Sequence, residues 1–154
     1  CMTVVNSDNG IVSFDAIYET LDRTTLSDRK VGDLLNVERS LRLGDELGGH
    51  ILSGHIIGTA EILKRDEVGD GVDFLISIPD GCNQFILEKG YIAVDGMSLT
   101  VGKCEEDCFF LHIIPETLRI TSIGNKSEGN LVNIEIDSRT QAVVEAMMRM
   151  GVES

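Results

Sequence analysis

An internal repeat constrains this chain more than any other feature. When the sequence is shifted by 97 positions, residues 1–40 align with residues 98–137 without a gap. The identical pairs include Thr3 with Thr100, Glu19 with Glu116, Thr20 with Thr117, Asn36 with Asn133 and Glu38 with Glu135. Such a repeat predicts two copies of one structural unit. The register also predicts that the first copy is truncated, because roughly 45–50 residues of its front half would precede Cys1.

Charge and hydropathy exclude several classes of function. The formal charge is −13, and so acidic a surface repels phosphate backbones, so we expect no nucleic-acid partner. No run of 18 apolar residues is present, so no membrane span is predicted. The four cysteines are too sparse for a zinc site, and we expect reduced thiols.

The second unit has the pattern of an antiparallel barrel. Short apolar segments recur between turn signals, and this spacing favours a closed sheet, because closure removes exposed edges. The expected strands are 50–63, 72–78, 91–94, 97–103, 108–114 and 131–136.

The first copy predicts a hairpin of 1–5 and 11–17 around an Asn-Gly turn, and a later strand at 34–38. We expect irregular chain at 20–27 and 115–124, a linker or short helix at 39–46, and a short helix at 84–87.

A helix is predicted from Ser138 to Met150. Ser138 is a suitable N-cap, and apolar residues follow at helical spacing: Val143, Ala146, Met147 and Met150. This stripe can pack on its own barrel or on the same helix of neighbouring chains, since methionine-rich seams suit helix bundles.

Two copies of one unit predict two similar concave sites. The strand after Gly96 places hydroxyls at Ser98 and Thr100 on one face, and the first copy has Cys1 and Thr3 there. We expect strands at 15–20 and 112–117 whose backbone groups pair with a flat heterocycle. His50 and His55 lie five apart and would face opposite sides of a strand, so they are not expected to share a metal.

These motifs resemble the riboflavin synthase family, and the resemblance spans the whole chain. The motifs are Val37-Glu38-Arg39, Gly48-Gly49-His50-Ile51-Leu52-Ser53-Gly54-His55, Lys89 to Val101, Ile114-Pro115-Glu116-Thr117-Leu118 and Val132 to Asp137. The resemblance implies an all-β fold of tandem six-stranded antiparallel Greek-key barrels, the first incomplete, with a C-terminal α-helix that holds a homotrimer. It divides the chain into 1–40 (end of the first barrel), 41–137 (second barrel) and 138–154 (oligomerisation helix).

The resemblance also implies a reaction. The family converts two molecules of 6,7-dimethyl-8-ribityllumazine into riboflavin and 5-amino-6-ribitylamino-uracil, without a metal or redox cofactor. A four-carbon unit passes between the lumazines, at a site between neighbouring subunits. We therefore expect a cytoplasmic transferase of riboflavin biosynthesis. If the front of the first barrel is truly absent, we expect an incomplete site and no turnover.

The resemblance assigns roles to particular residues. The implied catalytic residues are Cys1, His55, Ser98 and Asp137. The implied substrate-binding residues are Met2, Thr3, Asp15, Ala16, Ile17, Tyr18, Glu19, Thr20, Gly54, Ile56, Lys89, Leu99, Thr100, His112, Ile113, Ile114, Pro115, Glu116 and Thr117.

Two other functions deserve comparison. A non-catalytic lumazine or flavin antenna protein of the same superfamily is the main alternative, although such proteins depart from the enzyme pattern at site residues. The flavin-binding barrel of reductases is the other, but it would need a following nucleotide-binding domain with a Gly-rich loop, which the sequence lacks.

Overall fold

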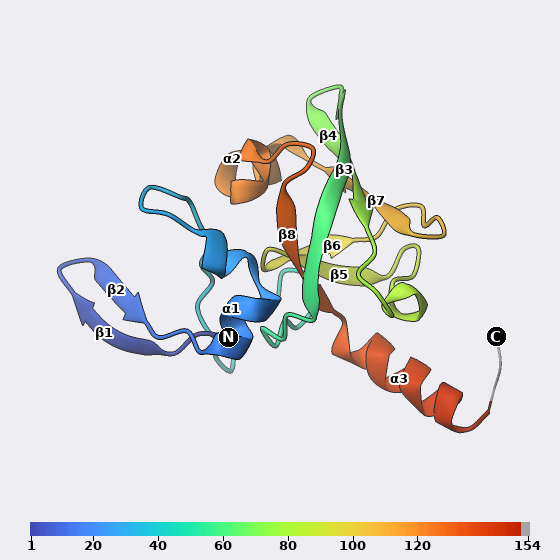
Figure 1. The fold of residues 1–154 in the computed structure, drawn as a ribbon, viewed down its shortest axis with the longest axis horizontal. Helices are drawn as coiled ribbons and strands as arrows, with labels where there is room; N and C mark the ends of the chain where they lie inside the picture. Colours follow the sequence, from blue (N-terminus) through green and yellow to red (C-terminus); the bar gives the residue numbers. More distant parts are fainter. Residues whose placement is uncertain (152–154) are drawn as a thin grey trace.

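The computed structural model describes residues 1–151, and its main body is a six-stranded antiparallel sheet (Figure 1). The strands lie in the order β6-β5-β8-β3-β4-β7, so the last strand is inserted between β5 and β3, as in a Greek key. Their bounds are β3 (Gly58–Val68), β4 (Gly71–Ser77), β5 (Tyr91–Val94), β6 (Met97–Thr100), β7 (Cys108–Ile113) and β8 (Leu131–Ile136).

The two outer strands of this sheet meet and close it. The chain that follows β6 pairs with β7: Gly102 N–H donates to the Phe110 carbonyl at 2.7 Å, and Phe110 N–H donates to Lys103 at 2.9 Å. Alternate residues of the strands fill the interior, among them the fully buried Ile62, Phe74 and Ile134. The predicted all-β barrel fold with a terminal helix is therefore confirmed.

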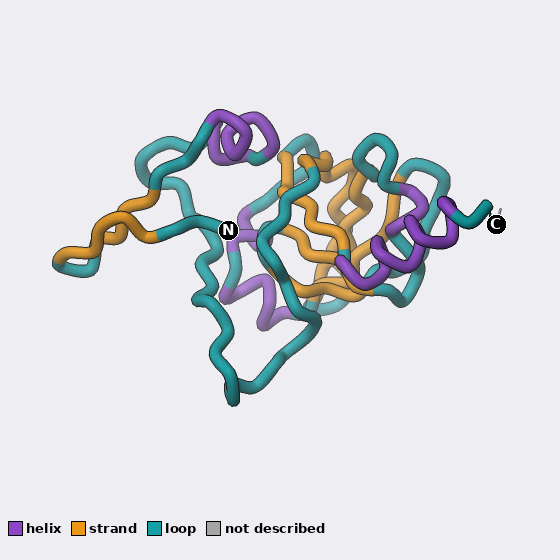
Figure 2. Tube along the Cα trace, turned by 90° about the horizontal axis from the view of Figure 1, so that it is seen from below, coloured by secondary structure: helices purple, strands orange, loops and turns teal. Residues whose placement is uncertain are grey.

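The first repeat forms a separate hairpin followed by two short helices. Strands β1 (Val4–Asp8) and β2 (Ile11–Phe14) pair antiparallel. Asn9 and Gly10 join them with φ of 49° and 80°, the left-handed conformation that a tight hairpin turn requires. Figures 1 and 2 show this hairpin standing away from the six-stranded barrel in both views.

The chain beyond each hairpin is helical, so the prediction of irregular chain at 20–27 and 115–124 was wrong. The first repeat has α1 (Tyr18–Arg23) and η1 (Thr25–Asp28), and the second has α2 (Pro115–Ile120) and η3 (Ser122–Asn125), each 97 positions later. Pro115 suits a first helical position, and an acidic residue occupies the first turn of each α-helix. These local signals outweighed the polar composition on which the prediction rested.

The strand expected at 34–38 is also wrong, since these residues form no strand. The equivalent β8 pairs with β3 on one side and β5 on the other. Among the described residues no strand lies beside 34–38, and a strand without a partner leaves its backbone groups unpaired.

The segment that joins the repeats is largely extended loop. The expected helix or linker at 39–46 is a linker without a helix, and the strand expected from His50 begins only at Gly58. Gly49 and Gly54 have φ of +121° and +76°, conformations that interrupt a regular strand. The short helix expected at 84–87 is η2 (Asn83–Phe85).

Helix α3 (Ser138–Arg149) follows β8 directly, and Asp137 rather than Ser138 caps it. The Asp137 carboxylate accepts the N–H groups of Arg139 and Thr140. Val144 packs against the barrel core, whereas the predicted apolar stripe is largely exposed. None of the helices within residues 1–151 has the length and apolar character needed to cross a membrane.

Candidate functional site

A cavity of about 830 Å³ opens between the first repeat and the segment leading into β3. This volume lies in the range of small-molecule sites, about 300–1,000 Å³. Seven residues that the sequence proposes for the site line it: Cys1, Met2, Glu19, Thr20, Gly54, His55 and Ile56. The lining residues that the sequence does not single out are Arg23, Thr24, Leu26, Ser53, Ile57, Ile136, Ser138 and Gln141.

Cys1 is held at this cavity by two backbone carbonyls. Its nitrogen donates to the Gly54 oxygen at 2.7 Å, and its Sγ donates to the Ser53 oxygen at 2.7 Å. A Cβ at position 54 would lie 2.5 Å from the Cys1 nitrogen and 2.6 Å from its Sγ. Only glycine therefore allows this approach, and its positive φ adds a second requirement for glycine.

Cys1 is the exposed thiol of the chain, whereas Cys82 is buried and the other two are half-buried. Burial raises the pKa of Cys82, Cys104 and Cys108, and nearby carboxylates add to the effect. Because the thiolate is the reactive form, these three thiols are poor nucleophiles.

Ser98, the repeat counterpart of Cys1, lies in a different environment. Its Oγ accepts the backbone N–H of His50 at 3.0 Å and lies 2.6 Å from the His50 Nδ1. Since the hydroxyl already accepts one bond, its own proton is available to donate to Nδ1. The imidazole also stacks on Tyr91, with ring centroids 5.0 Å apart.

His50 is the nearest titratable partner of Ser98. Burial lowers its pKa below the ordinary value, although the charges of Asp137 and Glu135 oppose the shift. The lowered pKa favours the neutral imidazole, whose Nδ1 can accept a hydrogen bond from the Ser98 hydroxyl. The sequence missed this contact because it treated residues 50–63 as one strand.

Asp137 is the N-cap of α3 as well as a proposed catalytic residue. Burial acts to raise its pKa, but hydrogen bonds from Thr140 and Arg139 and the charge of His50 outweigh it. The net pKa lies below the ordinary value, so the carboxylate is ionised at neutral pH. Its neighbours Ile136 and Ser138 line the Cys1 cavity.

One short segment, 49–54, therefore contacts both members of the repeat-matched pair Cys1 and Ser98. Gly49-His50 contacts Ser98, and Ser53-Gly54 contacts Cys1. Six residues span at most about 20 Å when fully extended, so the two environments belong to one region of the molecule.

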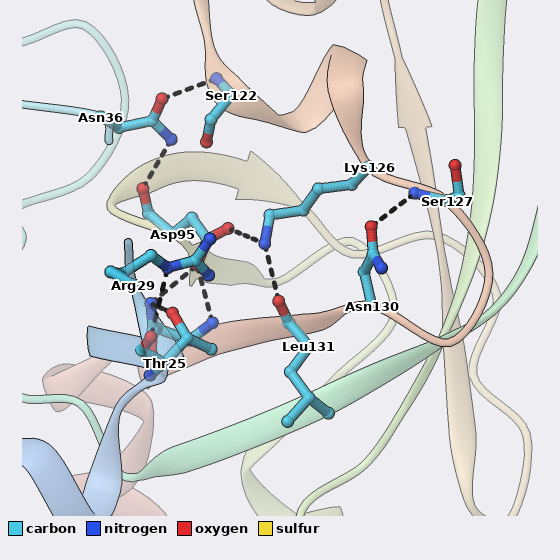
Figure 3. A network of polar contacts seen from close by, with 10 residues as sticks. Thr25, Arg29, Asn36, Asp95, Ser122, Lys126, Ser127, Asn130 and Leu131 are labelled. Atoms are coloured by element: carbon cyan, nitrogen blue, oxygen red, sulfur yellow. Dashed lines mark hydrogen bonds and ion pairs between the residues drawn. The ribbon is translucent and has the colours of Figure 1, made fainter. Parts of the chain in front are cut away.

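The repeats also exchange hydrogen bonds in a reciprocal way (Figure 3). Asn36 accepts the N–H of Ser122 at 2.7 Å, and the matched Asn133 accepts the N–H of Thr25 at 2.8 Å. Thr25 and Ser122 are themselves repeat partners, each the first residue of a 3-10 helix. Each repeat thus caps a helix of the other, which defines a local twofold relation between them.

A second cavity, of about 530 Å³, lies at this junction. Its wall consists of six repeat-matched pairs: Thr25 with Ser122, Asp28 with Asn125, Arg29 with Lys126, Gly32 with Gly129, Asp33 with Asn130, and Leu34 with Leu131. Lys126 is buried, with Nζ 3.2 Å from Asp95 and donating to Leu131 at 2.7 Å. The two acidic and two basic lining residues balance in charge, so this cavity belongs to the junction rather than to an anion site.

The other proposed residues lie outside the Cys1 cavity. In the first repeat these are Thr3, Asp15, Ala16, Ile17 and Tyr18, and in the second they are Lys89, Leu99, Thr100, His112, Ile113, Ile114, Pro115, Glu116 and Thr117. The strand expected at 15–20 is wrong, because β2 ends at Phe14 and α1 begins at Tyr18. The strand expected at 112–117 ends at Ile113, because α2 begins at Pro115. His112 Nδ1 lies 2.6 Å from Asp73, a contact that the sequence does not indicate.

Within residues 1–151 no group of three or more His, Cys, Asp or Glu side chains is arranged to hold a metal ion.

Similarity to known proteins agrees with this geometry. The family model described as the lumazine binding domain matches residues 1–40 and 53–137, and both segments contribute lining residues to the Cys1 cavity. Riboflavin synthase of Escherichia coli (strain K12) is 46% identical over 151 residues, which cover 97% of this chain and 71% of that protein. Riboflavin synthase of Chlamydia pneumoniae is 41% identical over 154 residues, 100% of this chain and 75% of that protein.

Solved structures show the same fold. The crystal structure of LumP complexed with riboflavin superimposes with a TM-score of 0.80 at 30% identity, over 89% of this chain and 74% of that one. LumP complexed with 6,7-dimethyl-8-(1'-D-ribityl) lumazine gives 0.77 at 28% identity, over 87% and 72%. The chain matches the lumazine binding domain model in two segments and aligns over nearly its whole length with riboflavin synthases, so it belongs to the riboflavin synthase family.

Proposed function

We propose that this chain acts as a riboflavin synthase that binds 6,7-dimethyl-8-ribityllumazine in the cavity beside Cys1 and a second lumazine beside Ser98. The main support for this proposal is that Cys1 and Ser98, which are matched by the repeat, both contact the single segment 49–54. A dismutation needs two copies of one substrate held together, and such alignment can contribute about 7–11 kcal/mol.

The chemistry requires a base and a nucleophile. One lumazine loses a proton from its acidic 7-methyl group, and the other accepts a nucleophile at C7. We assign these steps to Cys1, His55, Ser98 and Asp137, with the thiol or hydroxyl as nucleophile and the imidazole as base. The four-carbon transfer that follows makes the enzyme a transferase, whose products are riboflavin and 5-amino-6-ribitylamino-uracil.

The binding residues divide between the repeats in this proposal. Met2, Thr3, Asp15 to Thr20, Gly54 and Ile56 serve the first lumazine, and Lys89, Leu99, Thr100 and His112 to Thr117 serve the second. The proposal divides the chain into 1–40, 41–137 and 138–154 as two lumazine-binding units and a helical tail.

We further propose a homotrimer held by α3. The exposed Val143, Met147 and Met150 along α3 support this arrangement, because such a stripe needs a partner to be buried. The cytoplasm is the proposed compartment, since all four cysteines are thiols, the form that a reducing environment maintains.

The test is direct turnover. The protein is mixed with 6,7-dimethyl-8-ribityllumazine, and the absorbance of riboflavin is followed with time. We expect turnover from a chain in which the first barrel is complete, and we expect it to fall roughly 10²–10⁴-fold in C1S and in S98A. The variant D70N, in the β3–β4 turn, is the control and keeps wild-type turnover.

Binding without turnover would contradict the proposal. In that case the chain would quench the fluorescence of riboflavin or lumazine, but no product would appear. That outcome would favour the alternative, a non-catalytic lumazine or flavin antenna protein of the same superfamily.

A further inference from the structure

Strand β8 carries a polar face on the outside of the barrel. Val132, Ile134 and Ile136 point into the core, so Asn133, Glu135 and Asp137 occupy the opposite face. Asn133 contacts η1 of the first repeat, and Asp137 caps α3. Glu135, between them, contacts the segment that holds Cys1.

The Glu135 carboxylate is buried and strongly engaged. It is 4% exposed, and its Oε1 accepts three hydrogen bonds: from Ser53 N–H at 2.7 Å, Ser53 Oγ at 2.9 Å and Gly54 N–H at 3.0 Å. A buried carboxylate without such donors would be strongly destabilising. No ion pair to Glu135 occurs among the described residues, so these three donors satisfy its charge.

The same two residues face Cys1 on their other side. Their N–H groups point to Glu135, whereas the carbonyls of Ser53 and Gly54 accept the Cys1 Sγ and nitrogen. The next two residues, His55 and Ile56, line the cavity. Glu135 therefore links strand β8, through Ser53 and Gly54, to the Cys1 thiol and to the segment that carries His55.

We propose that Glu135 is a positioning residue of the Cys1 pocket, an inference that rests on the proposed lumazine site. Its carboxylate holds the Ser53-Gly54 turn in the conformation that seats the Cys1 thiol and directs His55 to the ligand. Charge-assisted hydrogen bonds are roughly twice as strong as neutral ones, so a neutral isostere holds this turn less tightly.

The repeat supplies a matched control. Glu38 is the counterpart of Glu135, 97 positions earlier, and it is exposed. Among the described residues it makes no side-chain hydrogen bond or ion pair. The same substitution at both positions therefore compares a glutamate that accepts hydrogen bonds from Ser53 and Gly54 with a glutamate that does not.

The experiment uses the full chain with E135Q and E38Q. Riboflavin is the probe, and its affinity is measured by fluorescence quenching at a temperature where circular dichroism shows both variants folded. The alkylation rate of Cys1 by iodoacetamide is measured by peptide mass spectrometry, with and without riboflavin. We expect E135Q to lose about tenfold in affinity and to alkylate Cys1 several-fold faster, and E38Q to match the wild type.

Wild-type and variant results separate the two proposals. If riboflavin fails to protect Cys1 from alkylation in the wild type, the proposed pocket is wrong. If riboflavin protects the wild type but E135Q keeps its affinity and its alkylation rate, the positioning role is overturned.

Should E135Q not fold, S53A tests the same contact by removing one donor. Faster Cys1 alkylation in S53A supports the role of the turn, and an unchanged rate contradicts it.

Discussion

The two repeats share a sequence pattern and differ in what surrounds them. Val37 is 80% exposed and Leu35 is 53% exposed, whereas their counterparts Ile134 and Val132 are fully buried at 0%. Strands β3 and β5 flank β8 in the second repeat, and no strand among the described residues flanks 34–38. The comparison shows that an apolar strand pattern becomes a strand only where partners supply hydrogen bonds and a core.

The helices of the two repeats, in contrast, are alike. Thr24 Oγ1 donates to the Thr20 carbonyl at 2.6 Å, and the matched Thr121 donates to Thr117 at 2.7 Å. Helical hydrogen bonds join residues close in sequence, so the same local sequence forms the same helix in either setting.

The largest expected effect on stability comes from shortening the matched apolar side chains Val37 and Ile134 to alanine. We expect I134A to lower the free energy of unfolding by about 2–5 kcal/mol, because it leaves a cavity in the barrel core. V37A should change it by less than about 0.5 kcal/mol, because this side chain is largely exposed. Urea unfolding measures both, and equal losses would show that residues 34–38 are packed as β8 is.

The next effect concerns the reciprocal asparagines. The Asn133 side chain bonds Thr25 twice and Asp95 once, and Asn36 bonds Ser122 and the Asp95 carbonyl. We expect N133A to cost about 2–3 kcal/mol and N36A about 1–2 kcal/mol.

The double variant tests whether the two asparagines stabilise one shared junction. Because both asparagines contact Asp95, the losses should not add in N36A/N133A, and a double-mutant cycle of urea unfolding measures the coupling. Strict additivity would contradict a shared junction between the repeats.

The smallest effect is the pH dependence of the Ser98 contact, which has no counterpart at Cys1. The folded-state pKa of His50 lies below 6.5, so the unfolded chain takes up the proton first as pH falls. Stability from this group is therefore complete above pH 6.5 and decreases as pH falls toward the folded pKa.

An NMR titration of His50 measures the shift, and H50Q should remove this component of the pH dependence of unfolding. A His50 pKa at or above 6.5 would contradict the burial of its ring.

Most of the barrel could be predicted because each strand of 72–136 is marked by alternation and by turns. The helices after each hairpin were missed because their signals are short: Pro115 at a first helical position, and one acidic residue in each first turn. Seven proposed site residues do meet at one cavity. His50 and Glu135 were missed because their roles depend on contacts 48 and 82 residues away.

The repeat and the hairpin turn at Asn9-Gly10 depend on neighbouring residues or on internal comparison, so the chain alone specifies them. The tertiary structure, in contrast, selected which of the matched segments 34–38 and 131–136 became a strand. It also decided that the matched positions Cys1 and Ser98 receive different partners from one segment: Ser53 and Gly54 for the thiol, and His50 for the hydroxyl. The physical reason is that strand pairing, burial and the Glu135 contact all join residues far apart in the chain, and their outcome depends on what the fold places opposite each position.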